Sequence, residues 1–306
     1  MADDSALRPG PTTGAPFGRV LTAMVTPFHE DGSMDLAGAA ALATHLVDAG
    51  CDGLVVSGTT GESPTTTDVE KERLVRAVVE AVGDRAHVVA GVGTYDTHHT
   101  VELAGQAEKA GAHGLLVVTP YYSKPTQEGL VQHFRAAADA TALPVMLYDI
   151  PPRSIVPIAP DTLARLAEHE RIVAVKDAKG DVFAASEAMA RTGLAYYSGE
   201  DALNLPLLAV GAVGMVSVVG HVAAAEYAAM VRAVDAGDLP AALQIHRRLI
   251  SAVRGIMMRA PGAVMAKAAV HLAGVIGGRT MRLPLLAATD DEVVTLGADL
   301  AEAGLR

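Results

Sequence analysis

We predict from this sequence an α/β fold, a (β/α)₈ TIM barrel with a C-terminal helical extension. Eight short apolar runs recur along the chain, and amphipathic helical patterns separate most of them. Successive runs start roughly 20 to 35 residues apart, which is the size of one βα unit. Because the runs are continuously apolar rather than alternating, they indicate strands buried on both faces, as in a parallel sheet covered by helices.

The predicted strands follow one another at regular intervals. In chain order they are "VLTAMVTPF" from Val20, "GLVVSG" from Gly53, "HVVAGVG" from His87, "GLLVVTP" from Gly114, "PVMLYDI" from Pro144, "IVAVKD" from Ile172, "LAYYSG" from Leu194 and "VGMVSVV" from Val213. Residues 67–83 and 97–111 are amphipathic and end at or near glycine, so we expect crossover helices there. An open doubly wound sheet is disfavoured, because "AGVGTYD" has Asp96 where a dinucleotide-binding turn needs a third glycine.

Three regions are expected along the chain. Residues 1–18 form a predicted flexible tail, 19–235 the barrel and 236–306 the C-terminal helical region. The tail has early acidic residues and no apolar segment, unlike a signal peptide. Residues 202–225 carry no Asp, Glu, Lys or Arg, and no basic residue other than a histidine, but polar residues, glycine and proline interrupt them. We therefore expect a helix end, a turn and a buried strand there rather than a membrane span.

Composition excludes several classes of function. The chain is 50% hydrophobic and 19% charged with a net charge of −11, which argues against disorder, nucleic-acid binding and binding to anionic membranes. A single cysteine, Cys51, permits no internal disulfide and suits the cytoplasm. The chain contains no complete P-loop, G-x-S-x-G or H-E-x-x-H motif. We expect no metal and no other cofactor.

Lys176 closes the sixth apolar run, and of the six lysines it is the one attached directly to a strand-like segment. A lysine there can extend to solvent or pair with Asp177 at the strand end. Alternatively, burial can lower the pKa of its ammonium, leaving a neutral amine that forms Schiff bases near neutral pH. The strand context alone leaves both interpretations open.

Other strand ends have similar double interpretations. The "GTTGE" segment, residues 58–62, is either a glycine-dependent turn or a set of backbone N–H groups and hydroxyls that binds a carboxylate. Tyr148 is either a core tyrosine or a reactive phenol. Arg153 either caps a loop or forms a bidentate contact with a carboxylate. In a barrel of this type, all of these residues would lie at the C-terminal ends of the strands, where active sites form.

Four of these segments, in this order, resemble a known family. "GTTGES" at 58–63, "TPYYSKPTQEGL" at 119–130, "YDIPPRS" at 148–154 and "VAVKDAKGD" at 173–181 are similar to the 4-hydroxy-tetrahydrodipicolinate synthase family. That family belongs to the pyruvate-dependent class I aldolases, and the similarity extends from about Val20 to the C-terminus. Its actinobacterial members are the most similar.

The resemblance implies a lyase reaction of lysine and diaminopimelate biosynthesis, the condensation of pyruvate with L-aspartate 4-semialdehyde. Lys176 would form the Schiff base with pyruvate, and Tyr148 would transfer protons. Thr60 would link Tyr148 to Tyr122 of a neighbouring subunit. The expected assembly is a homo-oligomer, a tetramer built as a dimer of dimers.

The resemblance also assigns residues that bind substrate. Thr59 and Thr60 would bind the carboxylate of pyruvate, and Arg153 the carboxylate of the semialdehyde. Gly199 and Val216 would line the pocket with their backbone. A departure from the family pattern is Asp149, where many members have Asn; we expect its side chain to face the outside of the barrel.

Two other functions stay open, and feedback inhibition is expected to be weak. Another pyruvate-dependent aldolase, such as an N-acetylneuraminate or 2-keto-3-deoxy-sugar-acid lyase, would share most of these residues but generally lacks Arg153. A noncatalytic small-acid-binding barrel is the alternative outside enzymes.

Lysine-sensitive family members bind lysine with two histidines and a glutamate, and this chain has Asp68, Lys71 and His99 at those positions, beside Tyr121.

Overall fold

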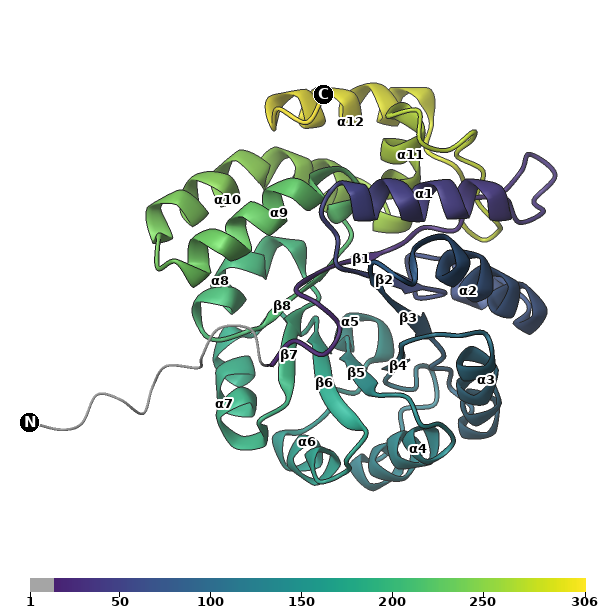
Figure 1. The fold of residues 1–306 in the computed structure, drawn as a ribbon, viewed down its shortest axis with the longest axis vertical. Coiled ribbons are helices and arrows are strands. Elements are labelled where there is room, and N and C mark those ends of the chain that lie inside the picture. The colour runs from purple at the N-terminus through teal and green to yellow at the C-terminus, as the bar shows by residue number, and fades with distance from the viewer. Residues whose placement is uncertain (1–13) are drawn as a thin grey trace, which may run out of the picture.

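The structure is a computed structural model and describes residues 14–306. Eight parallel strands close into a barrel in sequence order, β1 to β8 (Figure 1). They are β1 (Val20–Ala23), β2 (Gly53–Val56), β3 (His87–Gly91), β4 (Gly114–Val118), β5 (Val145–Asp149), β6 (Ile172–Asp177), β7 (Ala195–Ser198) and β8 (Gly214–Ser217). Each lies within its predicted apolar run, so the predicted (β/α)₈ barrel is confirmed.

Helices surround the strands on the outside of the barrel (Figure 1). They are α1 (Leu36–Asp48), α2 (Asp68–Val82), α3 (Thr97–Lys109), α4 (Gln127–Asp139), α5 (Pro151–Ser154), α6 (Pro160–Ala167), α7 (Val182–Thr192), α8 (Asn204–Ala209) and α9 (Gly220–Asp235). The predicted helix at 67–83 is α2. Its start is fixed by a capping box in which Thr67 and Glu70 satisfy each other's backbone N–H groups.

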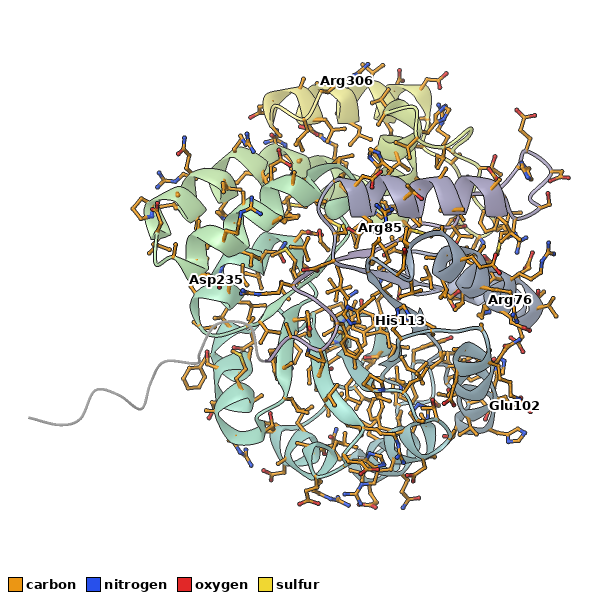
Figure 2. All side chains as sticks on the ribbon, viewed as in Figure 1. Arg76, Arg85, Glu102, His113, Asp235 and Arg306 are labelled. Carbon is orange, nitrogen blue, oxygen red and sulfur yellow. The ribbon has the colours of Figure 1, made fainter. Side chains whose placement is uncertain are left out.

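The outer helices bury their apolar faces and expose charge. On α2, Leu74, Val75 and Val78 are buried against the strands. The opposite faces carry charged side chains such as Arg76 of α2, paired with Glu72 at 2.6 Å, and Glu102 of α3 (Figure 2). Exposed pairs of this kind contribute little to stability, so burial of the apolar faces holds the helices in place.

A C-terminal group of helices follows the barrel. It comprises α10 (Leu239–Val253), a π-helical turn (Arg254–Met258), α11 (Gly262–Leu272) and α12 (Asp290–Glu302). These helices contact one another and α9, and in Figure 1 they lie beside α1 at the edge of the barrel. The predicted C-terminal helical extension is therefore present, while the division at residue 236 stays a prediction.

The predicted tail, residues 1–18, falls mostly outside the described residues. Its last part is described, and Phe17 there is fully buried. The Phe17 backbone N–H donates to the Tyr197 hydroxyl (3.2 Å), which donates in turn to the Gly18 carbonyl oxygen (2.9 Å). Phe17 thus belongs to the packed core, where it lies beside Gly53 and Gly114 at the N-terminal ends of β2 and β4.

The apolar stretch at 202–225 contains α8, a turn, β8 and the start of α9, as expected. Among the described residues, no single helix is long and apolar enough to cross a membrane. The segments Leu239–Met258 and Gly262–Leu272 meet that length and composition only as a pair, and they are bent by 118° relative to each other.

Candidate active site

Tyr148 and Lys176 lie side by side at the C-terminal ends of β5 and β6. They are paired in register, and directly paired residues of parallel strands point to the same face of the sheet. The Lys176 Nζ lies 4.3 Å from the centroid of the Tyr148 ring. Both side chains are almost completely buried, with exposed fractions of 4% for Lys176 and 5% for Tyr148. The ammonium of Lys176 therefore does not reach solvent, which removes the first of the two sequence interpretations.

Burial lowers the pKa of Lys176 to about 8. The negative charge of Asp201 opposes this change, the positive charge of Arg153 adds to it, and Glu200 opposes it. A pKa of 8 instead of 10.5 raises the neutral fraction of the amine at pH 7 by roughly 300-fold. A lowered pKa of this kind is what a Schiff-base lysine requires.

Tyr148 is held in its protonated form. Burial raises the pKa of its phenol above the usual range, while the charge of Arg153 and a hydrogen bond with the Thr59 side chain oppose that rise. A protonated phenol beside a neutral amine can donate a proton to a leaving hydroxyl and recover it later. The arrangement of the pair is therefore one that can combine a nucleophile with an acid–base group.

The threonine side chain that acts on the Tyr148 phenol is that of Thr59, whereas the family resemblance assigned the link to Thr60. Thr59 also lines a cavity of about 50 Å³ together with Gly58, Tyr121 and Tyr148. Thr60 is buried, and the lining of that cavity does not include it. A larger, mostly apolar cavity of about 240 Å³ lies between α9 and α10, and its lining includes neither Tyr148 nor Lys176.

Gly199 lies next to Lys176, and Val216 faces the barrel interior. A Cβ at position 199 would stand 2.9 Å from Cγ and 3.0 Å from Cε of Lys176, so only glycine leaves room for the lysine stem. Val216 is buried on β8. Gly214 pairs in register with Tyr197, which pairs with Lys176, so these positions face the same side of the sheet as Lys176. Val216 lies two residues after Gly214 and therefore faces that side too. Gly199 thus borders Lys176, while the role of Val216 stays a prediction.

Arg153 and Tyr122 lie at the edge of the site. Arg153 belongs to α5, directly after Tyr148 and the end of β5, and it is exposed although its charge acts on both Tyr148 and Lys176. Tyr122 is 87% exposed and has a backbone φ of 71°, which is rare for a tyrosine. Within this chain, the Tyr122 side chain thus points away from the core.

Two carboxylates near Lys176, Glu200 and Asp201, were missed by the sequence reasoning. Asp201 is 3% exposed and accepts hydrogen bonds from the Val218 and Val219 backbone N–H groups (2.8 and 3.2 Å). It also accepts bonds from the side chains of Ser217, Tyr227 and Asn204. Asp201 thereby fixes the end of β8 and places a negative charge near Lys176. Its position in "SGED", at the end of a strand, was the available signal.

The Asp149 side chain faces the outside of the barrel, as predicted. Its Oδ2 lies 3.1 Å from Lys179 Nζ, which is also 2.7 Å from Asp177 Oδ2. The backbone N–H of Ile158 donates to the same Asp149 oxygen at 3.2 Å. Burial raises the pKa of Asp149 to about 6 despite the nearby lysine. The departure from the family's Asn therefore lies behind the reactive pair and outside the pocket.

The sequence matches the model of the dihydrodipicolinate synthetase family over residues 16–303. The chain belongs to the dihydrodipicolinate synthetase family. A protein of Kineococcus radiotolerans named 4-hydroxy-tetrahydrodipicolinate synthase is 69% identical over 290 residues, which cover 95% of this chain and 94% of that protein. The predicted resemblance is thus confirmed.

Solved structures of dihydrodipicolinate synthases have the same fold. That of Bacillus anthracis is 45% identical with a TM-score of 0.89 and covers 93% of this chain and 98% of its own. That of Cyanidioschyzon merolae, solved with lysine bound, is 40% identical with a TM-score of 0.91 and covers 95% and 99%. In this member of the dihydrodipicolinate synthetase family, the fold shared with these structures therefore includes both the barrel and C-terminal helices.

Proposed function

We propose that this chain condenses pyruvate with L-aspartate 4-semialdehyde through a Schiff base on Lys176, forming 4-hydroxy-tetrahydrodipicolinate for diaminopimelate and lysine biosynthesis. The observation that carries the proposal is the buried Lys176–Tyr148 pair with its lowered lysine pKa, in a chain of the dihydrodipicolinate synthetase family. The relative that is 69% identical is named 4-hydroxy-tetrahydrodipicolinate synthase, and this name supports the same reaction.

The first half of the reaction activates pyruvate. The neutral Nζ of Lys176 attacks the ketone carbon, and loss of water leaves a protonated imine. The imine withdraws electrons, so the methyl group loses a proton and an enamine forms. Tyr148 supplies and accepts the protons, because the buried lysine cannot act as acid and base at once. Thr59 and Thr60 bind the carboxylate of pyruvate with hydroxyl and backbone N–H groups.

The second half forms and releases the product. The enamine carbon attacks the aldehyde carbon of the semialdehyde, while Arg153 binds the carboxylate of that substrate. The amino group of the semialdehyde then attacks the imine carbon and displaces Lys176, which closes the ring and frees the lysine. One water is released for each pair of substrates joined. Gly199 leaves space for the lysine stem throughout, and Val216 borders the pocket.

We propose that the chain works as a homo-oligomer, a tetramer built of dimers, in the cytoplasm, with no metal or other cofactor. The exposed Tyr122, with its positive φ, suits donation to the site of a neighbouring copy. Tyr95 and Tyr121, whose ring centroids are 5.5 Å apart, place further aromatic surface nearby. Sedimentation of the purified protein measures the assembly, and a monomer with full activity would contradict the role of Tyr122.

A mass adduct with pyruvate after borohydride reduction is the experiment that tests this function. A condensation assay with pyruvate and aspartate 4-semialdehyde follows, with cleavage of N-acetylneuraminate and of a 2-keto-3-deoxy sugar acid as controls. An adduct with condensation supports the proposal. An adduct with sugar-acid cleavage alone favours the other aldolases, and the absence of any adduct favours a binding protein.

We expect Thr59 to contribute more to turnover than Thr60 does. Thr59→Val removes the hydroxyl that contacts Tyr148, so kcat should fall by about 100-fold, in the range of lost proton-transfer groups. Thr60→Val should change kcat by less than about tenfold, as loss of one neutral hydrogen bond does. Steady-state kinetics of the two variants decide the assignment. A larger loss in Thr60→Val would restore the relay role that the sequence assigned to Thr60.

We expect Arg153→Ala to weaken use of the semialdehyde and to preserve the pyruvate adduct. Loss of a charged carboxylate contact lowers kcat/KM for the semialdehyde by about 10- to 100-fold. Arg153 also lowers the pKa of Lys176, so adduct formation is compared at a pH well above 8, where the amine is neutral in either protein. Arg153→Lys, which keeps the charge, is the matched control. Equal loss of both activities in Arg153→Ala would contradict this role.

We expect lysine to inhibit this enzyme weakly or not at all. Asp68 is the one carboxylate among Asp68, Lys71 and His99, the residues at the positions that bind lysine in sensitive members. Its Oδ2 lies 3.0 Å from His99 Nε2, so this carboxylate already has a partner within the chain. Lys71 donates to the Thr66 carbonyl oxygen at 2.5 Å and adds positive charge near any cationic ligand. Loss of the glutamate's charged contact and addition of a like charge each cost on the order of 1 to 3 kcal/mol, which together weaken inhibition by a factor of about 30 to more than 10,000.

Titration of lysine into the condensation assay measures this inhibition. Half-inhibition at submillimolar lysine would show that the prediction is wrong. Lys71→His and His99→Glu, introduced together, restore the residue types of lysine-sensitive members at two positions and should increase the inhibition.

A further inference from the structure

Glu62, the last residue of the "GTTGE" loop, is bonded through both carboxylate oxygens to the C-terminal part of the chain. Its Oε1 accepts a hydrogen bond from Lys267 Nζ on α11. Its Oε2 accepts one from the backbone N–H of Arg282, at 2.9 Å. Glu62 is 2% exposed and has a φ of 58°, a left-handed conformation that a glutamate adopts only when its surroundings hold it there.

Lys267 carries a charged side chain that is completely buried, in a part of α11 that is otherwise apolar. Burial lowers the pKa of its ammonium, and Glu62 opposes that change. The ammonium also donates to the Thr280 carbonyl oxygen at 2.9 Å and lies 4.4 Å from the centroid of the Phe28 ring. A buried lysine is unfavourable unless paired, so the contact with Glu62 offsets the cost of burying the Lys267 ammonium.

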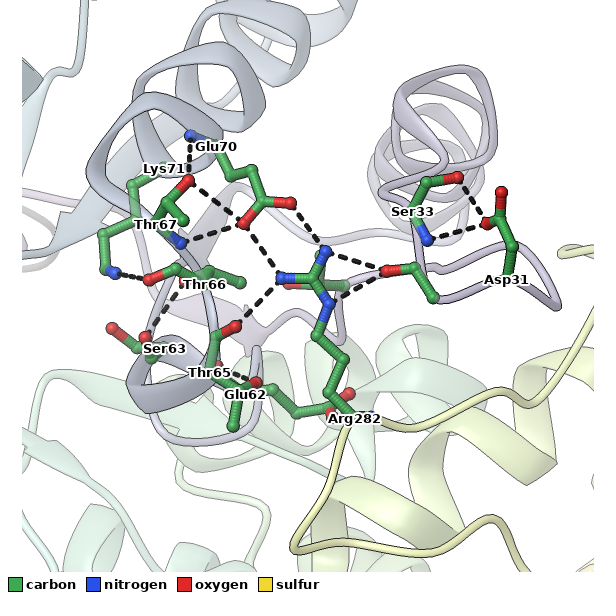
Figure 3. A network of polar contacts seen from close by, with 12 residues as sticks. Asp31, Ser33, Glu62, Ser63, Thr65, Thr66, Thr67, Glu70, Lys71 and Arg282 are labelled. Carbon is green, nitrogen blue, oxygen red and sulfur yellow. Dashed lines mark hydrogen bonds and ion pairs between the residues drawn. The ribbon is translucent and has the colours of Figure 1, made fainter.

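Arg282 joins the same network from the segment between α11 and α12 (Figure 3). Its guanidinium donates to the Thr65 carbonyl oxygen (2.9 Å), to Glu70 (2.9 and 2.6 Å) and to the Gly32 carbonyl oxygen (2.9 and 2.8 Å). This contact lowers the pKa of Glu70 to about 2. Arg282 therefore ties the residues after the loop, and the start of α2, to the C-terminal segment.

The loop between these anchors is short and internally bonded. The Glu62 N–H donates to the Thr59 carbonyl oxygen and the Ser63 N–H donates to the Gly58 carbonyl oxygen, both at 3.2 Å. A shift of Glu62 is therefore transmitted directly to Thr59. Thr59 acts on the Tyr148 phenol and lines the adjoining cavity, so the loop connects the anchor to the site.

We propose that Glu62, Lys267 and Arg282 are positioning residues through which the C-terminal region holds the Gly58–Glu62 loop in the shape that binds the carboxylate of pyruvate. The proposal rests on the proposed function of the loop. It gives the C-terminal helices a role in the first substrate's binding, although none of the three side chains touches that substrate.

The test separates binding of pyruvate from folding stability. Lys267→Met removes the ammonium and leaves a buried carboxylate, so both the melting temperature and the affinity for pyruvate should fall. The double variant Glu62→Met/Lys267→Met replaces the whole pair with apolar side chains of similar length, which often restores stability. In this variant the loop stays without its anchor, so the pyruvate concentration for half-maximal borohydride trapping should remain raised by about tenfold or more.

Arg282→Lys provides a second variant that is expected to fold, because the side chain is partly exposed and keeps its charge. Half-maximal trapping should need about three- to tenfold more pyruvate, and KM for the semialdehyde should change by less than about twofold. Arg279→Lys is the matched control, because Arg279 lies in the same segment and pairs with Asp290 and the Ala288 carbonyl oxygen instead of the loop. That control should leave both constants unchanged.

Three results would overturn the positioning role. They are recovery of pyruvate affinity together with stability in the double variant, an unchanged pyruvate affinity in Arg282→Lys, and an equal change in both substrates' constants. Absence of an adduct in the unmodified protein is a separate outcome, which contradicts the proposed function itself.

Discussion

Lys176→Ala should abolish the borohydride-trapped pyruvate adduct and lower turnover by a factor of about 10⁴ or more, as loss of a covalent nucleophile does in other enzymes. The reason is that Lys176 combines burial, a pKa lowered to about 8 and contact with the Tyr148 ring. Mass spectrometry of the trapped protein and the condensation assay measure the two effects.

The pH dependence of trapping provides an independent check. Burial disfavours the charged ammonium, so the neutral amine predominates above the lowered pKa. The rate of adduct formation should therefore rise with pH and level off above about 8. A rise that continues to the usual lysine range would show that burial does not lower the pKa of this amine.

Two variants control for other causes. Lys176→Met keeps the aliphatic stem beside Gly199 and should be as inactive as Lys176→Ala, which excludes a packing defect. Lys109→Ala removes an exposed lysine at the end of α3 and should retain full activity. An adduct that persists in Lys176→Ala would assign the chemistry to another lysine.

The barrel was predictable because its strands are buried on both faces. The run "GLLVV" of β4 has four buried residues out of five. Because such a strand contains neither alternating polar residues nor charges, it can be recognised in the sequence as a continuous apolar run. The C-terminal ends of the strands were predictable for the same reason, since each apolar run ends at its first polar residue. In a barrel of this type, active sites form at these ends. Lys176 and Tyr148 were found in this way, and their pairing in register follows from the sheet.

The contacts that shape the site were not predictable from local sequence. Glu62 and Lys267 are 205 residues apart, and nothing in the pattern around either residue names the other. The choice between Thr59 and Thr60 depends on which way two adjacent side chains turn in an irregular loop, where no periodicity applies. The positive φ of Ser57 and Glu62, at residues other than glycine, adds to that uncertainty. Lone polar residues in apolar helices, such as Lys267, are the signal that was overlooked.

Tyr148→Phe should lower kcat by about 100- to 10,000-fold, the range for loss of a general acid–base group. Its pKa, raised by burial, keeps the phenol protonated, so it can donate a proton when the carbinolamine loses water. The ring remains, and with it the contact with Lys176, so the affinity for pyruvate should change little. Rapid-quench trapping with borohydride measures how far imine formation slows.

Tyr196→Phe is the matched control for this prediction. Tyr196 is also a buried tyrosine of the barrel, but it lies next to Tyr197 in sequence and so points to the outside of the sheet. Within the part of the chain that the structure describes, its hydroxyl has no hydrogen-bond partner. Loss of that oxygen should therefore leave kcat unchanged. Turnover of Tyr148→Phe within about tenfold of the unmodified enzyme would assign the proton transfers to another group or to water.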